Sequence, residues 1–182
     1  MLKKLQNIFA IPELKKRIIF TAGLLAVYRL GGHIPTPGVD AGALKAYFMA
    51  NQGTLFGLYD MFVGGSLERA TVFALGIMPY ISASIILQLF GAVIPYFERL
   101  RKEGDAGRKK ITQFTRYGTV LLALIQSYGI SIFLLSMGGQ IPGLISMNGF
   151  AFQILTMLTL TTGTMFIMWL GEQITERGIG NG

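Results

Sequence analysis

The sequence contains no cysteine and a single histidine, His33. Without thiols the chain can form no disulfide bond, and thiolate catalysis and thiolate metal ligands are excluded. Charged residues are also scarce, at 14% of the 182 residues against 52% hydrophobic residues, and the mean hydropathy is +0.53. This composition suits lipid better than a water-exposed surface.

Two long stretches lack Asp, Glu, Lys and Arg altogether, residues 70–97 and 117–171. A transmembrane helix needs about 20 mainly apolar residues. The second stretch is therefore long enough for two spans, which Gly, Pro and Asn in residues 137–149 separate. We predict an all-α polytopic membrane protein, and its four spans are expected at residues 18–34, 70–97, 117–136 and 150–171.

Lysine and arginine gather in particular connections between these spans. Residues 1–17 and 98–116 are rich in both, whereas residues 35–54 and 137–149 contain Lys45 as their only cation. Because short basic loops stay in the cytoplasm, we predict a cytoplasmic amino terminus. The net charge of +7 does not indicate nucleic-acid binding, because the cations lie on one side of this topology.

The two ends of the chain are predicted to lie on that cytoplasmic side. Within residues 1–17, apolar residues recur at helical spacing beside lysines, which is typical of an amphipathic helix at the membrane interface. Residues 172–182 form a glycine-rich turn after the fourth span. A turn connects elements, so we expect this chain to be a fragment that a further polypeptide segment completes.

Residues 55–69 form an apolar stretch in the external connection between the first two spans. They are too few and too rich in glycine to cross a bilayer, and an apolar stretch of this length is often re-entrant. At membrane depth it needs protein or a cavity around it. An amphipathic loop on the outer leaflet is the alternative. The stretch contains Leu55, Phe56, Leu58, Tyr59, Met61, Phe62, Val63, Gly64 and Gly65.

The second predicted span is uncharged but carries polar residues in its middle. Residues three or four apart share a helix face, and the polar residues fall on two faces about 100° apart. The alternative is that these serines and this glutamine only contribute to helix packing, at about 0.6 kcal/mol each. One face holds Ile77, Ile81, Ser84 and Gln88, and the other holds Met78, Ser82, Ile85 and Leu89.

Catalytic constellations are missing from the sequence. No acidic residue lies inside the predicted spans, and one histidine cannot form a catalytic dyad or a metal site with them. The glycines of residues 178–182 follow no strand, so they are not a dinucleotide loop. We therefore predict a protein that is not an enzyme and that holds no metal and no cofactor.

Several long motifs resemble the SecY family, which forms the channel of the bacterial Sec protein translocase. The resemblance covers nearly the whole chain and implies the N-terminal half of a ten-helix, inverted-repeat channel, which stops before the fifth helix. The motifs are residues 17–21 (RIIFT), 28–31 (YRLG), 34–38 (IPTPG), 73–86 (FALGIMPYISASII), 103–109 (EGDAGRK) and 171–182 (GEQITERGIGNG).

The resemblance also implies a role for three groups of residues. Residues 55–69 match the plug, a short helix that seals the external funnel, which favours the re-entrant alternative. Ile77 and Ile81 match the apolar ring at the pore constriction. The lateral gate, through which hydrophobic segments leave for lipid, is hypothesised to be bordered by Met78, Ser82, Ile85, Gln88 and Leu89.

The function implied is a passive channel in the bacterial plasma (inner) membrane, which moves unfolded secretory polypeptides across it and releases hydrophobic segments into the lipid bilayer. The expected partners are SecE and SecG, the motor ATPase SecA or a translating ribosome, signal sequences and nascent polypeptides, and the missing C-terminal half. Half of a secondary solute transporter is the alternative, but it predicts an ionisable residue at the midplane, which these spans lack.

Overall fold

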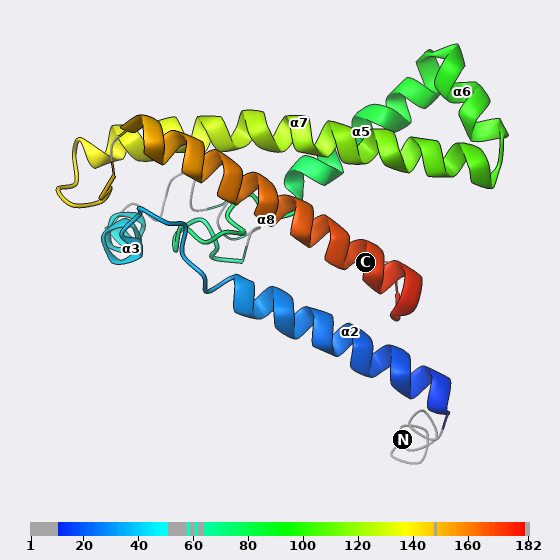
Figure 1. Ribbon diagram of the computed structural model, residues 1–182, viewed down its shortest axis with the longest axis horizontal. Helices are drawn as coiled ribbons and strands as arrows, with labels where there is room; N and C mark the ends of the chain where they lie inside the picture. Colours follow the sequence, from blue (N-terminus) through cyan, green and yellow to red (C-terminus); the bar gives the residue numbers. More distant parts are fainter. Residues whose placement is uncertain (1–10, 51–57, 59–60, 62–63, 148, 181–182) are drawn as a thin grey trace.

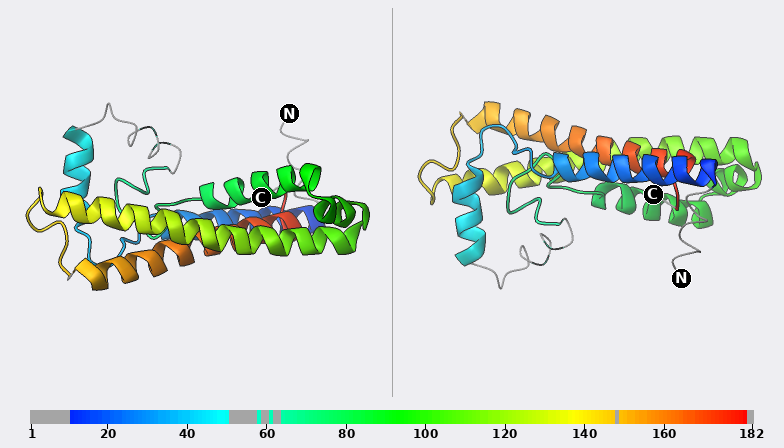
Figure 2. Two further views of the ribbon diagram at one scale, coloured as in Figure 1. Left: turned by 90° about the horizontal axis from the view of Figure 1, so that it is seen from above. Right: turned by 90° about the horizontal axis from the view of Figure 1, so that it is seen from below.

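The computed structural model describes residues 11–50, 58, 61, 64–147 and 149–180. These residues form helices and turns without a β-strand, apart from two isolated bridges. The helix α7 packs along α8, α5 packs on α7, and α2 packs on α8, while α3 lies across one end of this bundle and α6 lies at the other end (Figures 1 and 2). The helices are α2 (Pro12–Gly31), α3 (Ala41–Ala50), α5 (Met78–Val93), α6 (Pro95–Lys102), α7 (Asp105–Gly138) and α8 (Gly149–Arg177).

Two helices, α7 and α8, are long and apolar enough to cross a membrane, and α5 with α6 is a third candidate that bends by 97°. The predicted first span falls in α2, which does not meet this criterion. Its cations, among them Lys16, Arg17 and Arg29, explain why. A membrane crossing by α2 therefore stays a prediction.

The helices extend beyond the residues that hydropathy assigns to the spans. α7 starts at Asp105 rather than near Tyr117, and its 34 residues measure about 51 Å, well above the hydrocarbon thickness of about 30 Å. α2 starts at Pro12, because proline suits the first turn of a helix. Hydropathy marks the part of a helix that fits lipid, while the basic turns outside lipid continue the same helix.

α7 and α8 pack closely because small residues recur every four positions along α7. Thr115, Thr119, Ala123, Ser127 and Ser131 are all buried. From α8, the Thr161 hydroxyl approaches the Ser127 hydroxyl to 3.4 Å. Small and hydroxylated residues let transmembrane helices approach closely.

The predicted external loop at residues 35–54 contains a helix, α3, that the sequence analysis missed. The Asp40 carboxylate accepts hydrogen bonds from the backbone N–H groups of Gly42 (2.8 Å) and Ala43 (3.0 Å), which caps the helix. Leu44 and Phe48, four residues apart, are buried. These residues belong to the core cluster and hold α3 against the end of the helical bundle, so residues 41–50 of this connection form a packed helix rather than an open loop.

Candidate functional site

Residues 71–76, which we call the wedge segment, lead into α5 as a series of turns. The predicted second span begins at Ala70, but the helix starts only at Met78 because Pro79 occupies its first turn. Positive φ angles at Ala70 (45°) and Gly76 (57°) bound the segment. It is deeply buried, with Phe73 and Leu75 exposed by 4% and 1%.

The two residues expected in the pore ring face one hollow of about 520 Å³. Ile77 and Ile81 line it beside Leu25 of α2 and Leu170 of α8. Ile81 is 41% exposed. The structure thus brings both isoleucines to one apolar surface. Met78, which the sequence analysis assigned to the other face, lines the same hollow.

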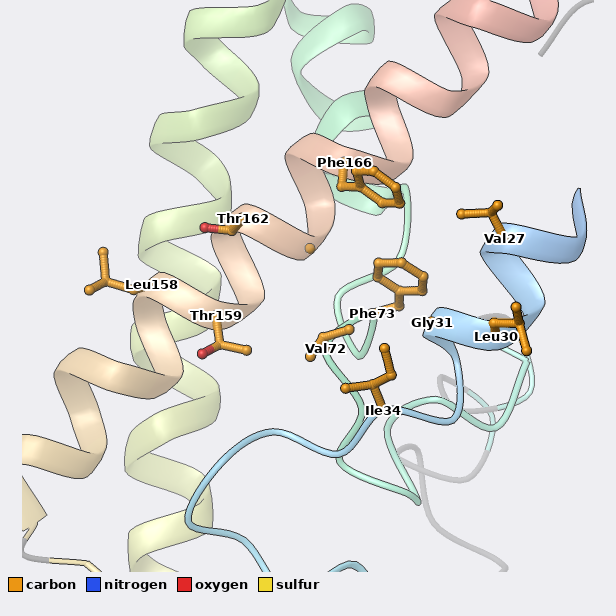
Figure 3. Close-up of a pocket in the computed structure, with 11 residues that line it drawn as sticks. Val27, Leu30, Gly31, Ile34, Val72, Phe73, Leu158, Thr159, Thr162 and Phe166 are labelled. Carbon is orange, nitrogen blue, oxygen red and sulfur yellow. The ribbon is translucent and has the colours of Figure 1, made fainter. Parts of the chain in front are cut away.

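A second hollow of about 650 Å³ lies between α2 and α8 (Figure 3). Its lining is apolar apart from Thr159 and Thr162, and it includes Val72 and Phe73 of the wedge segment. The two hollows share no lining residue. The wedge segment therefore contributes Val72 and Phe73 to this second hollow, and Gly76 to the hollow that Ile77 and Ile81 line.

The residues hypothesised for the lateral gate form a largely uncovered surface of α5. Met78, Ile85 and Leu89 are 40%, 52% and 61% exposed, and Ser82 is half-buried. The Gln88 side-chain amide donates a hydrogen bond of 3.2 Å to the Ser84 hydroxyl. This hydrogen bond uses one N–H of the Gln88 amide within its own helix.

The predicted plug lies partly outside the described residues, which leave out Leu55, Phe56, Tyr59, Phe62 and Val63. The described plug residues, by contrast, stand out from the core: Leu58 and Met61 have helical backbone and are 58% and 78% exposed. Gly64 and Gly65 follow with φ angles of 68° and 76°. Burial resumes at Ser66 and Leu67.

An ion pair at the basic end of the bundle was not expected from the sequence. The Arg116 guanidinium donates two hydrogen bonds to the Glu172 carboxylate, Nε to Oε1 at 2.8 Å and Nη2 to Oε2 at 2.7 Å. The pair borders a hollow of about 220 Å³ together with Ile77, Tyr80 and Glu176. The two residues are 56 positions apart, so no sequence pattern pairs them.

Two of the sequence motifs meet at the same end. In RIIFT, Arg17 Nη1 donates to the Gly178 carbonyl at 3.4 Å, and the Thr21 hydroxyl accepts from the Ile179 N–H at 3.0 Å. Gly178 and Ile179 belong to the glycine-rich turn after α8. A methyl group at Gly178 would lie 2.6 Å from the Thr21 hydroxyl oxygen, so the motifs fit only with glycine there.

His33 occupies a structural position at the end of α2. Its Nδ1 lies 2.8 Å from the Arg29 carbonyl oxygen, which can only accept, so Nδ1 carries the proton. Its Nε2 lies 3.4 Å from Nη1 of Arg69. Within the described part of the chain, no three His, Cys, Asp or Glu side chains gather as a metal site.

The sequence motifs and this helical arrangement agree with a comparison against protein families, in which SecY matches residues 71–182. The chain belongs to the SecY family. The resemblance seen in the sequence is thereby confirmed, and so is its fold class as an all-α polytopic membrane protein. The family finding favours a channel over the half-transporter alternative.

Curated SecY proteins are similar over almost the whole chain. The protein translocase subunit SecY of Escherichia coli K12 is 55% identical over 170 residues, 93% of this chain and 38% of its own length. Those of Buchnera aphidicola and Aquifex aeolicus are 55% and 48% identical, with 48% and 43% of their lengths covered. The chain thus spans less than half the length of these relatives.

Proposed function

We propose that this chain forms part of the pore wall of a protein-conducting channel that passes unfolded secretory polypeptides through the plasma membrane of a bacterium. The observation that carries the proposal is the apolar surface of Ile77 and Ile81 at the start of α5, in a SecY-family chain. The chain holds only part of the pore, and a C-terminal half supplies the remainder. Its role is passive, with no catalytic step.

Ile77 and Ile81 act as the share of the pore ring that this chain supplies. Aliphatic side chains in a narrow constriction exclude water and so block ions, yet they can fit around a polypeptide that passes between them. Their surroundings support this role, because the hollow that they face is lined mainly by apolar side chains from α2 and α8. A polar side chain in the ring would admit water.

Residues 55–69 act as the plug, with its apolar positions from Leu55 to Val63 and its glycines Gly64 and Gly65. The exposed Leu58 and Met61 support this role, because apolar side chains outside the core need another surface to cover them. The two glycines have left-handed backbone, which side-chain-bearing residues rarely adopt. They form the joint between the plug and the packed core.

The exposed face of α5 borders the lateral gate. Met78, Ile85 and Leu89 present apolar surface, half-buried Ser82 adds a hydroxyl group, and Gln88 on the adjacent face adds a side-chain amide. A signal sequence, which is itself an apolar helix, fits such a surface better than water does. A hydrophobic segment of a nascent polypeptide would leave along this face for the lipid bilayer.

The partners proposed are those of a translocase complex. SecE and SecG would bind in the membrane, and SecA or a translating ribosome would supply the driving force from the cytoplasm. The basic residues at the end that carries α6 support a cytoplasmic position for that end, and hence for the amino terminus. Arg99, Arg101, Arg108 and Lys109 are all exposed there.

Substitution of the pore ring tests the proposed function. We expect Ile81→Asn, in the complete channel reconstituted in liposomes, to raise the resting ion leak several-fold, because a polar amide hydrates the constriction. Ile81→Leu keeps an aliphatic side chain and should leave the leak unchanged. Measured ion efflux that is the same for both variants would refute a pore-ring role for Ile81.

A further inference from the structure

We propose that Gly31 and Gly163 are positioning residues for the pore ring: they let α2 and α8 clamp the wedge segment, which holds Ile77 and Ile81 in place. This inference rests on the proposed function. The wedge segment, residues 71–76, connects the plug to α5 and lies between α2 and α8 (Figure 3).

The clamp depends on the absence of side chains at two glycines. A methyl group at Gly163 of α8 would overlap the carbonyl oxygen of Val72 and lie 2.9 Å from its carbonyl carbon. A methyl group at Gly31 of α2 would overlap the ring of Phe73. The backbone of the wedge segment thus rests directly on α8, and its largest side chain rests directly on α2.

Aromatic stacking fixes the ring of Phe73 between the two helices. Its centroid lies 5.7 Å from that of Tyr28 on α2, with 6° between the planes, and 6.1 Å from that of Phe166 on α8, with 13°. Trp169 extends the stack beyond Phe166 at 5.8 Å. With both rings stacked against it, Phe73 has little room to swing aside for a methyl group at Gly31.

Backbone hydrogen bonds tie the start of the wedge segment and the residue before it to the loop that follows α2. The Thr36 N–H donates to the Ala70 carbonyl at 2.6 Å, and the Val72 N–H donates to the Ile34 carbonyl at 3.0 Å. Thr71 is buried, and its N–H donates to the Ser66 carbonyl at 2.9 Å. Tertiary packing therefore begins at Ser66, after the two plug glycines.

The other end of the wedge segment leads straight into the pore ring. The Gly76 N–H donates to the Phe73 carbonyl at 2.8 Å. The Ile77 carbonyl then accepts from Tyr80 (3.0 Å) and Ile81 (3.1 Å) as the first turn of α5. A displacement of Val72 or Phe73 is therefore passed on to both isoleucines.

The test uses Gly163→Ala in the complete channel, reconstituted in liposomes. The new methyl must push the Val72 carbonyl away, so we expect a several-fold higher resting ion leak. In a complete channel whose other subunits and C-terminal half are made cysteine-free, a single cysteine at Ile81 should also react at a changed rate with a soluble maleimide, and this chain adds no further cysteine. Gly23→Ala and Gly129→Ala are matched controls, because a methyl at either glycine meets no atom within 4 Å. Their leak and labelling rate should equal those of the parent.

A folded Gly163→Ala protein with unchanged leak and unchanged labelling overturns the inference. If this variant fails to fold, Gly31→Ala takes its place, with Phe73→Leu as the second change. We expect Gly31→Ala to leak and the double variant to leak less, because leucine lacks the ring atoms that the methyl would overlap. Equal leak in the single and double variants also overturns the inference.

Ile81→Asn separates this failure from failure of the proposed function. If Ile81→Asn leaks and Gly163→Ala does not, the pore ring stands and the clamp is wrong. If neither leaks, the pore-ring role itself is wrong.

Discussion

At the scale of single residues, Arg116 and Glu172 form the contact that depends most on exact side-chain geometry. Two parallel hydrogen bonds of 2.8 and 2.7 Å join α7 to α8. The Glu172 side chain is only 18% exposed, whereas Arg116 is 46% exposed. A bidentate pair with one partly buried partner contributes more than an exposed surface pair does.

We predict that Glu172→Gln lowers the free energy of unfolding by about 1–2 kcal/mol, because the amide cannot accept two charge-assisted hydrogen bonds from Arg116. Thermal unfolding in detergent measures the change.

Arg116→Lys should also destabilise the protein, because an ammonium group cannot form the paired contact. Glu98→Gln is the matched control: its 2.6 Å bond to Lys102 joins exposed residues of one helix. An equal change for Glu98→Gln and Glu172→Gln would contradict the prediction.

Sequence reasoning brought some residues together and missed other contacts, for a physical reason. Ile77 and Ile81 are four residues apart, so helical periodicity alone places them on one face. Glu172 and Arg116 meet only because α7 and α8 pack with one particular axial register. Gly163 is similar: the sequence indicates a small residue in a packed helix, but the carbonyl of Val72 against it comes from tertiary structure.

At the scale of elements, α5 is the helix whose faces have the most different surroundings. Its buried face packs on α7, where a methyl group at Gly118 would lie 3.4 Å from Cβ of Ala83. Its exposed face carries Ile85 and Leu89. One helix thus joins the fixed core to a surface that is free to receive a hydrophobic segment.

We predict that a photo-crosslinker at Ile85 labels the signal sequence of a stalled secretory polypeptide in the complete channel. The same crosslinker at Ile125 of α7 is the control, because Ile85 and Ile125 are similarly exposed, at 52% and 60%. Gel analysis of the crosslinked products measures both. We expect labelling at Ile85 to exceed that at Ile125 several-fold. Equal labelling would show that α5 does not border the gate.

The elements also show which local signals the sequence carries. The charge-free stretches located α7 and α8, because lipid demands apolar length. They could not fix the helix ends, since basic turns such as residues 105–110 continue α7 into water. The helix α3 was missed because its short apolar stripe, Leu44 and Phe48, is stabilised by contacts with distant loops rather than by its own length.

At the scale of the whole molecule, positive charge gathers at one end of the bundle. The start of α2, the helix α6 and the start of α7 lie at that end, and α3 lies at the other (Figure 2). The loop of residues 38–40 is tied to that of residues 144–146 beside α3, where the Asp40 N–H donates to the Leu144 carbonyl at 2.9 Å. This division is what the positive-inside rule requires of a membrane protein with a cytoplasmic amino terminus.

We predict that α2 crosses the membrane although its four cations weaken its apolar character, because its neighbour α8 fixes its direction and its charges sit near its ends. Single cysteines in an otherwise cysteine-free channel test this in intact cells, and this chain has none of its own. Lys45→Cys on α3 should react with a membrane-impermeant maleimide added outside. Lys16→Cys at the start of α2 should react only after the membrane is permeabilised.

Two further cysteines calibrate that measurement. Both replace exposed residues, one in the loop after α7 and one in the basic first turns of α7. Pro142→Cys belongs to the neutral external loop and should react like Lys45→Cys. Lys109→Cys belongs to the basic end and should react like Lys16→Cys. Suppose that Lys45→Cys and Lys16→Cys react with the maleimide under the same condition, while Pro142→Cys reacts from outside and Lys109→Cys reacts only after permeabilisation. Then α7 crosses the membrane and α2 does not. The amino-terminal helix would then lie along the membrane surface, and the clamp on the wedge segment could not be formed at membrane depth.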